Sequence, residues 1–490
     1  MVTYAIVMAA AAAVSPNLPP GELPVTAADL VEVADISGVV VSPDGASVAY
    51  RIERASIADN NVTASWFVAP TDGGKPGRRI GKGGTVAFDH AGGIAPETAT
   101  WSPDSRWLYY RARIDGETQI WQAAAGGNGA TRLTSDDADV VDFKLGSDGA
   151  TLIYRVGASR AAVRSAQQHI YDEGMRVDAT TDLAQPVAGG RMNDGERRMQ
   201  RFTGDWFDRI DLLGDVPLTE VTVAIDRQGA VRRGLTEGHD ELGLPASVES
   251  GSDRLDIART GLRAHLTVQR ADGSTLPCPQ SACPDTLVAA IWLADRRSVL
   301  LTTRPSPRRD SLSIWRVGEA SATPVVSVRG RLGGDRSSRS SCAATASRAI
   351  CVAAAATSPP RLVSIDFRSG QEMQIADPNA ALRKRIARDC HGSRVESQRH
   401  HFHGVLLAPN RSSRPPALVI NYYACDGFLR GGVGDELPML PLVGAGQAVL
   451  CIAKPWAPGP FEATRNYKLA LEGIRTITAQ LADARRIDAA

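Results

Sequence analysis

The chain has 490 residues, of which 43% are hydrophobic and 22% charged, an ordinary composition for a soluble globular protein that is too long for a single core. Its 55 Lys and Arg residues nearly balance 54 Asp and Glu residues, so the formal net charge is +1. This balance excludes the basic excess typical of nucleic-acid-binding proteins. We therefore expect more than one domain and no nucleic-acid partner.

The first residues, MVTYAIVMAAAAAVSPNLPP, form a short apolar segment that ends in small residues and prolines. Such a segment is typical of a secretory signal, although no Lys or Arg precedes it. We expect residues 1–20 to be a signal segment and the protein to be periplasmic or secreted, with a frayed N-terminus of a cytoplasmic protein as the alternative. No segment reaches the about 20 apolar residues that span a bilayer, so no membrane span is expected.

A short helix is expected next, in TAADLVEVADI, with Thr26 as N-cap and Asp29 at the capping-box position. Three segments beyond it share one pattern, VSPDGASVAY from Val41, WSPDSRWLYY from Trp101 and LGSDGATLIY from Leu145. In each, an Asp-Gly or Asp-Ser turn precedes a run with the two-residue alternation of a strand. The pattern predicts a repeated hairpin.

Weaker copies follow in AIDRQGAVRRG from Ala224, ESGSDRLDIAR from Glu249, WLADRRSVLLT from Trp292 and AATASRAICVA from Ala343. Seven copies, mostly roughly 45–60 residues apart, predict a β-propeller of about seven blades over residues 21–380. Between the third and fourth copies, AAVRSAQQHIYDEGM has helical periodicity and predicts an insertion on one rim of the propeller.

The chain contains seven cysteines, and two pairs lie close in sequence, Cys278/Cys283 and Cys342/Cys351. In an exported protein these pairs could be disulfides, whereas in a cytoplasmic one all cysteines would be small buried hydrophobes. The odd number leaves at least one thiol free. Neither pair has the spacing of a zinc site, so no metal is expected.

The pattern of apolar residues changes after residue 380. HFHGVLLAP from His401, PPALVINYYA from Pro415 and AGQAVLCIAKP from Ala445 are apolar runs, and NYKLALEGIRTITAQLADARRI from Asn466 has helical spacing. Continuous apolar strands indicate a largely parallel sheet covered by helices on both faces. The fold class is therefore mixed, an all-β propeller followed by the first half of an α/β domain over residues 381–490. His401 and His403 share one strand face without an expected carboxylate partner, which disfavours a metal site there.

The segment PALVINYYACDGFLRGG brings Tyr422 and Tyr423 to a glycine-rich loop at the C-terminal end of a buried strand, where open α/β sheets place their active sites. It resembles the prolyl oligopeptidase (S9) serine peptidases, in which a strand ends in a Tyr whose hydroxyl helps form the oxyanion hole. The resemblance places that role on Tyr423, with Tyr422 as the alternative. A Tyr that only caps a core strand is the other interpretation. Cys425 and Cys451 follow as either a disulfide or free buried thiols.

The SPDG repeats, the entry helix and the strand–Tyr–loop order all fit the S9 family. More narrowly, NYYACDGFLRGGVGDELP and AVLCIAKP resemble the bacterial lasso-peptide isopeptidases, which open the isopeptide bond between a lasso peptide's N-terminal amine and an Asp or Glu side chain. The resemblance implies a peptide substrate, such as a threaded lasso peptide, and no cofactor.

One departure from the family pattern concerns the nucleophile. The 490 residues contain no G-x-S-x-G motif, and the ending RRIDAA resembles the step that precedes the nucleophile strand. We expect a C-terminally truncated chain whose catalytic Ser, Asp and His would lie beyond residue 490, so that this chain alone would be inactive. The alternative is a non-catalytic periplasmic β-propeller, a binding or scaffold protein with a vestigial hydrolase remnant.

Overall fold

The computed structural model describes residues 24–488 except 89–93, 98, 128, 174–191, 194–195, 198–212, 215, 226–230, 235–247, 251–252, 261–262, 307, 335–341, 398–401, 424, 426, 431–436 and 454–461. The residues form two compact units. Of the described residues, the larger unit contains those within Val31–Asn379 and Asp426–Leu429, and the smaller contains those within Met1–Leu30, Ala380–Cys425 and Arg430–Ala490.

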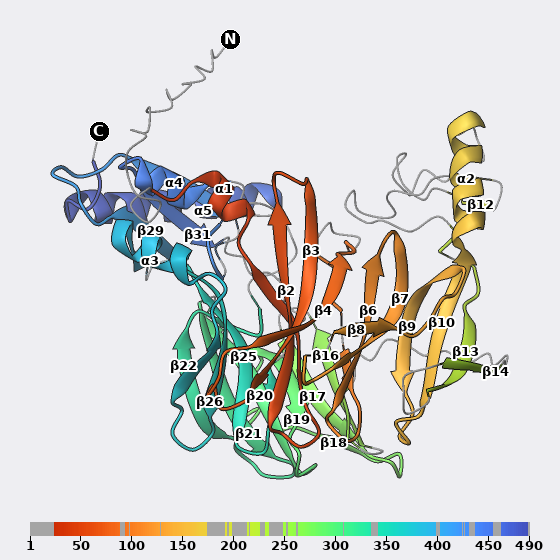
Figure 1. Cartoon of the computed structure of the whole chain (residues 1–490). Coiled ribbons are helices and arrows are strands. Elements are labelled where there is room, and N and C mark those ends of the chain that lie inside the picture. The colour runs from red at the N-terminus through yellow and green to blue at the C-terminus, as the bar shows by residue number, and fades with distance from the viewer. Residues whose placement is uncertain are drawn as a thin grey trace. The chain divides into compact units, whose positions relative to one another are not determined.

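The larger unit consists of antiparallel sheets of four or five strands, here called blades 1 to 6 in chain order (Figure 1). Blade 1 contains β1 (Asp35–Val41), β2 (Ser47–Ser56), β3 (Asn61–Pro70) and β4 (Arg78–Thr85). Blade 2 contains β5 (Ala99–Trp101), β6 (Trp107–Ile114), β7 (Glu117–Ala124) and β8 (Ala130–Arg132). Blade 3 contains β9 (Ala138–Leu145), β10 (Thr151–Ser159), β13 (Thr219–Ile225) and β14 (Val231–Gly234). A short parallel pairing of β4 with β6 joins blades 1 and 2 into one sheet.

The remaining three blades follow the same meander. Blade 4 contains β15 (Val248–Ser250), β16 (Asp253–Thr260), β17 (Arg263–Gln269) and β18 (Thr275–Pro277). Blade 5 contains β19 (Leu287–Trp292), β20 (Ser298–Ser306), β21 (Arg309–Arg316) and β22 (Thr323–Arg329). Blade 6 contains β23 (Arg331–Leu332), β24 (Ala343–Ala344), β25 (Arg348–Ala355), β26 (Ser358–Asp366) and β27 (Glu372–Ala376).

The insertion expected after the third repeat is a helix, α2 (Arg160–Glu173), which projects from the end of β10 (Figure 1). A two-stranded hairpin, β11 (Met192–Asn193) and β12 (Glu196–Arg197), follows it before the chain returns to blade 3. The segment from Ala224, counted as a repeat of its own, therefore spans the end of β13 and all of β14, the paired last two strands of blade 3. The expectation that it opens a separate blade was wrong, because a turn followed by an alternating strand recurs at every hairpin of a blade. The described residues contain six blades rather than about seven.

Asp side chains shape the turn that precedes the second strand of four blades. In each, the carboxylate accepts a hydrogen bond from the backbone N–H two residues later, at 2.9–3.2 Å, namely in Asp44, Asp104, Asp148 and Asp295. The residue after each Asp has a positive φ of 52–72°, namely Gly45, Ser105, Gly149 and Arg296. The Asp thus fixes the turn even where the left-handed position is not a glycine.

Apolar side chains from facing blades form the cores of the larger unit. Trp66 of blade 1 and Tyr110 of blade 2 are fully buried with ring centroids 5.5 Å apart. Equivalent clusters lie between blades 2 and 3, 4 and 5, and 5 and 6. Tyr50 of blade 1 shares a cluster with Ile350 and Val352 of blade 6, so the last blade packs against the first. Face-to-face packing of this kind is how propeller blades bury the surfaces that a single blade leaves open.

Arg–carboxylate pairs accompany these cores. Four blades carry an Arg on the second strand paired with a neighbouring acid, as Arg51–Glu53, Arg111–Glu97, Arg155–Asp142 and Arg304–Asp310. Asp310 is fully buried, and its carboxylate accepts hydrogen bonds from Arg304 Nε at 2.8 Å and from the Leu332 backbone N–H at 2.9 Å. This carboxylate therefore links blade 5 to blade 6.

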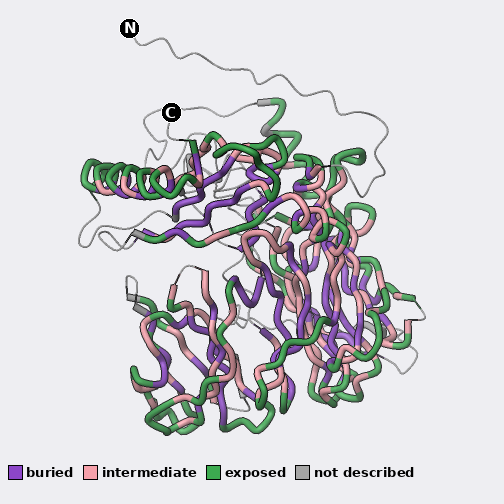
Figure 2. Tube along the Cα trace, turned by 90° about the vertical axis from the view of Figure 1, so that its left-hand side faces the viewer, coloured by how far each residue is buried: buried purple, intermediate pink, exposed green. Residues whose placement is uncertain are grey.

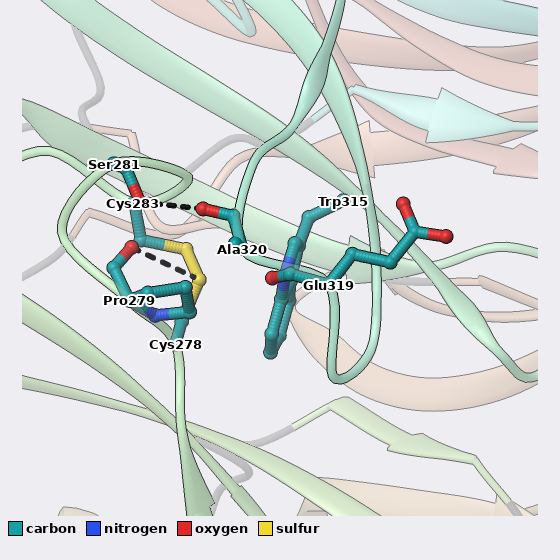
Figure 3. The surroundings of a disulfide bond; sticks show 7 residues. All are labelled: Cys278, Pro279, Ser281, Cys283, Trp315, Glu319 and Ala320. Atoms are coloured by element: carbon teal, nitrogen blue, oxygen red, sulfur yellow. Dashed lines mark hydrogen bonds between the residues drawn. A yellow bond between two sulfur atoms is a disulfide. The ribbon is translucent and has the colours of Figure 1, made fainter.

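Both cysteine pairs that are close in sequence form disulfides, Cys278–Cys283 and Cys342–Cys351. The first closes a turn after blade 4, where the Ser281 hydroxyl points at the Ala320 carbonyl and donates a hydrogen bond to it (Figure 3). The second lies within the core cluster between blades 5 and 6.

The smaller unit is an α/β structure. It contains α3 (Ala380–Asp389), β28 (Cys390–Ser397), β29 (Phe402–Pro409), β30 (Leu418–Tyr423), α4 (Met439–Gly444), β31 (Ala448–Ala453) and α5 (Ala463–Asp483). The strand order is β28-β29-β31-β30, with β30 and β31 parallel and the other pairs antiparallel.

Helices cover both faces of this sheet, as the apolar runs predict. Phe402, Leu406, Leu450 and Ile452 pack against α5 on one face. The strand residues between them, such as Leu407, are equally buried, and α4 contacts β29 and β31. In Figure 2 the two central strands are purple along most of their length, while the outer side of α5 is green.

The entry helix α1 (Ala27–Val31) has the expected capping box, because the Thr26 N–H bonds to Asp29 Oδ2 at 2.8 Å and the Asp29 N–H to Thr26 Oγ1 at 3.2 Å. Arg385 of α3 holds both Asp29 carboxylate oxygens, at 2.8 and 2.7 Å. Residues 24–30 consequently group with the smaller unit, whereas the sequence assigned 21–380 to the propeller. The helices in the described ranges include none long and apolar enough to cross a membrane.

Candidate active site

The carboxyl ends of the parallel strands β30 and β31 meet at one edge of the α/β sheet. The register aligns Tyr422 with Ile452 and Tyr423 with Ala453. This is the edge at which open α/β sheets bind ligands, because loops leaving the strand ends diverge there. Both sequence-predicted tyrosines therefore lie in the last two positions of β30.

Tyr422 packs toward α5. It belongs with Leu418 and Ile420 to the half-buried residues that contact the core cluster under this helix. Burial raises the pKa of the Tyr422 hydroxyl above its ordinary value, and an interaction with Tyr467 raises it further. The hydroxyl is thus a neutral hydrogen-bond donor throughout the physiological pH range.

Tyr423 is the final residue of β30, and only its backbone lies within the described part of the chain. Its role as an oxyanion donor therefore stays a prediction. The glycine-rich loop that carries the resemblance to isopeptidases is described only at Cys425 and from Gly427 to Arg430, so most of it also lies outside the described residues.

A disulfide secures the chain just beyond these tyrosines. Cys425 bonds to Cys451 of β31, and both side chains are buried. Cys451 is the register partner of Asn421, whose Nδ2 lies 3.4 Å from the Cys451 sulfur. The alternative left open by the sequence is decided in favour of the bridge, which leaves the buried Cys390 as the free thiol in the described part of the chain.

Tyr467, which the sequence analysis did not consider, lies in the first turns of α5 and is 74% exposed. Its side chain interacts electrostatically with Tyr422 and contributes to the raised pKa of that hydroxyl. The available signal was an aromatic residue on the polar side of an amphipathic helix, a position at which burial does not explain the residue type.

The described residues hold no group of three or more His, Cys, Asp or Glu side chains arranged for a metal ion. His403 does have a carboxylate neighbour, because Glu396 Oε1 of β28 lies 3.3 Å from its Nδ1. The expectation of no such partner was wrong, since it considered one strand and not the strand paired with it.

The sequence and the fold were compared with those of known proteins. No protein-family model matches the chain. The chain is 27% identical over 472 residues to the lasso peptide isopeptidase AtxE2 of Asticcacaulis excentricus, a match that covers 88% of this chain and 62% of that protein. A solved structure of an AtxE2 isopeptidase variant with Astexin3-dC4 bound matches with a TM-score of 0.70 at 23% identity, over 95% of this chain and 74% of that one.

A Pyrococcus horikoshii acylaminoacyl peptidase matches with a TM-score of 0.54 at 14% identity, over 95% of this chain and 73% of that one. The fold, antiparallel blades followed by an α/β sheet, is therefore that of the propeller-containing S9 peptidases. The chain is a homologue of the lasso peptide isopeptidase AtxE2, of whose length it spans 62%.

Proposed function

We propose that this chain is the propeller and the first part of the catalytic domain of an S9-type serine peptide hydrolase whose complete form acts as an isopeptidase on lasso peptides. The observation that carries the proposal is the match to AtxE2 over 88% of the chain, which extends through both units. A strand ending in two tyrosines, next to a loop tethered by the Cys425–Cys451 disulfide, supports it at the site.

In the proposed mechanism a serine attacks the isopeptide carbonyl, and the carbonyl oxygen becomes an oxyanion. Tyr422 is half-buried against α5, so the proposal gives the role of oxyanion donor to its neighbour Tyr423 and keeps Tyr422 as the alternative. One donor aimed at the developing charge lowers the barrier by about 2.7–4 kcal/mol. Amide hydrolysis by an activated hydroxyl and fixed donors needs no cofactor.

The proposal places the serine, together with its Asp and His partners, after residue 490, because the 490 residues contain no G-x-S-x-G motif. It also places the protein outside the cytoplasm. Three disulfides support this location, since such bonds persist in oxidising compartments.

Fluorophosphonate labelling tests the proposal. The complete product of the gene should acquire one label, and mass spectrometry should find it on a serine framed by glycines, C-terminal to residue 490. The 490-residue chain serves as the matched control and should remain unlabelled. A complete product that stays unlabelled while folded would contradict the proposal and favour the non-catalytic propeller.

A further inference from the structure

A groove on the larger unit lies between the outer strand of blade 1 and the face of blade 2. It has a volume of about 430 Å³ and is lined by Arg79, Ile80, Gly81, Lys82, Ile114 and Trp121. We call it the β4 groove. Its volume is at the lower end of the roughly 300–1,000 Å³ of small-ligand sites, so it suits the end of a chain rather than an extended segment.

Two β-bulges explain why four consecutive residues of β4 line one groove. The pairing of β4 with β3 shifts register at Ile80 and again at Gly83. A regular strand would send alternate side chains to opposite faces, whereas a bulge re-aims them locally. Arg79 and Lys82 thus flank Ile80 at the same opening.

Close backbone approach fixes the floor of the groove. A Cβ atom at Gly81 would overlap the Tyr110 hydroxyl and would lie 3.1 Å from the Ala130 Cβ, so only glycine fits there. The opposite wall includes Gly127 and Gly129, which have positive φ values of 88° and 93°. The shape is therefore set by the Gly81 backbone packed against the Tyr110 and Ala130 side chains, and by the two glycines of the opposite wall.

The chemistry of the lining is cationic and apolar. Arg79 and Lys82 are exposed, and the lining contains no acidic side chain. Ile80 is 2% exposed, and the half-buried Trp121 provides an aromatic wall. The charge complement of this site is an anion attached to an apolar group.

Two buried donors, one in the groove wall and one behind it, lack hydrogen-bond partners within the described residues. They are the Tyr110 hydroxyl, on a side chain with 0% exposure, and the Trp121 Nε1. The Arg79 charge acts on the Tyr110 hydroxyl, which lies directly under Gly81. Trp121 lines the groove, whereas Tyr110 lies behind Gly81. Buried polar atoms are nearly always paired, so the Trp121 Nε1 beside a cationic opening indicates a site for an acceptor-bearing ligand.

We propose that the β4 groove binds the free C-terminal carboxylate of a peptide whose last side chain is apolar. The carboxylate pairs with Arg79 and Lys82, and the apolar side chain packs on Trp121 and Ile80. The choice of a peptide as the carrier rests on the proposed function, whereas the need for an apolar carboxylate rests on the lining alone.

Calorimetric titration of the full 490-residue chain tests this assignment. The probes are N-acetyl-Ala-Leu and its C-terminal amide. The acid should bind about tenfold more tightly than the amide, and Arg79→Gln or Lys82→Gln should weaken acid binding about threefold to tenfold without changing amide binding. Trp121→Ala should weaken both probes.

Lys75→Gln is the matched control, because Lys75 is an exposed cation of the same blade outside the groove, and it should leave both affinities unchanged. Circular dichroism verifies that each variant is folded. Equal binding of acid and amide, or acid binding that survives the Arg79→Gln/Lys82→Gln double substitution, would overturn the proposal. Neither readout involves catalysis, so such a failure would leave the proposed hydrolase function standing.

Discussion

Replacing Gly473, in the middle of α5, by alanine should have two effects of opposite sign on the stability of this helix. Helix propensity alone favours alanine over glycine by about 1 kcal/mol in a helix interior. However, a Cβ at residue 473 would lie 2.5 Å from Cδ2 of Phe402 and closer still to its Cε2 and Cζ. Carbon atoms in contact are about 3.5–4.0 Å apart.

Phe402 is 1% exposed within the cluster under α5, so its ring has no free space into which to move. Overpacking of this kind costs about 1–3 kcal/mol, and overlap with three ring atoms places Gly473→Ala near the upper limit. Subtracting the propensity gain leaves a net loss of about 2 kcal/mol, or roughly a thirtyfold rise in the local opening equilibrium.

Hydrogen exchange of peptides from α5, followed by mass spectrometry, measures this opening directly, since a chain of two units need not unfold in one transition. Ala479→Gly, at an exposed position of the same helix, calibrates propensity alone and should raise the opening about fivefold. Adding Phe402→Leu to Gly473→Ala should give a loss smaller than the sum of the single effects. Slower exchange in Gly473→Ala would refute the reasoning.

Three further predictions concern buried or half-buried groups. Asp310→Asn should lower the free energy of unfolding by about 3 kcal/mol, because it leaves a partly buried Arg and a backbone N–H without their anion. Asp104→Asn, in an exposed pair, should change the free energy of unfolding by less than about 1 kcal/mol. Denaturant midpoints test both variants, and equal effects would contradict the role of burial. Burial raises the pKa of Cys390 to about 12, so a thiol reagent at pH 8 should find no thiol in the native protein and one after denaturation without reductant, and a reactive native thiol would contradict this. Burial opposes ionisation of Asp29, yet hydrogen bonds from Arg385 and from the N-cap Thr26 lower the pKa of its carboxyl. The ionised Asp29 therefore stabilises the fold at a pH above its unfolded-state pKa. This contribution disappears as the pH falls through the lowered pKa of the folded state. Arg385→Gln should therefore reduce the protection of α1 amides at neutral pH and flatten its loss in acid, and an unchanged pH profile of exchange would contradict the pairing.

Local chemistry explains which features the sequence predicted. An Asp at a turn bonds to the backbone two residues away, so the hairpin motif works without knowledge of the rest of the fold. The same holds for the Thr26–Asp29 capping box, whose partners are three residues apart. Continuous apolar runs likewise indicate strands buried on both faces, and this signal lies within each strand and does not depend on where the covering helices are.

Features that depend on distant partners were not predictable. The weaker repeat from Ala224, which keeps the Asp and the Gly, could not reveal that the chain had returned to blade 3 after an insertion. Grouping of the entry helix with the smaller unit depends on Arg385, more than 350 residues away from Asp29. The β4 groove depends on bulges and on Gly81 facing Tyr110, which alternation alone does not encode.

The central claim is that a tyrosine at the end of β30 stabilises an oxyanion. The most direct measurement compares the isopeptide hydrolysis rates of Tyr423→Phe and Tyr422→Phe in the complete gene product, because Phe removes only the hydroxyl. We predict that Tyr423→Phe lowers kcat about 100-fold to 1,000-fold with little change in KM, whereas Tyr422→Phe has a small effect. If both variants retain the parent kcat, the account of the site is contradicted.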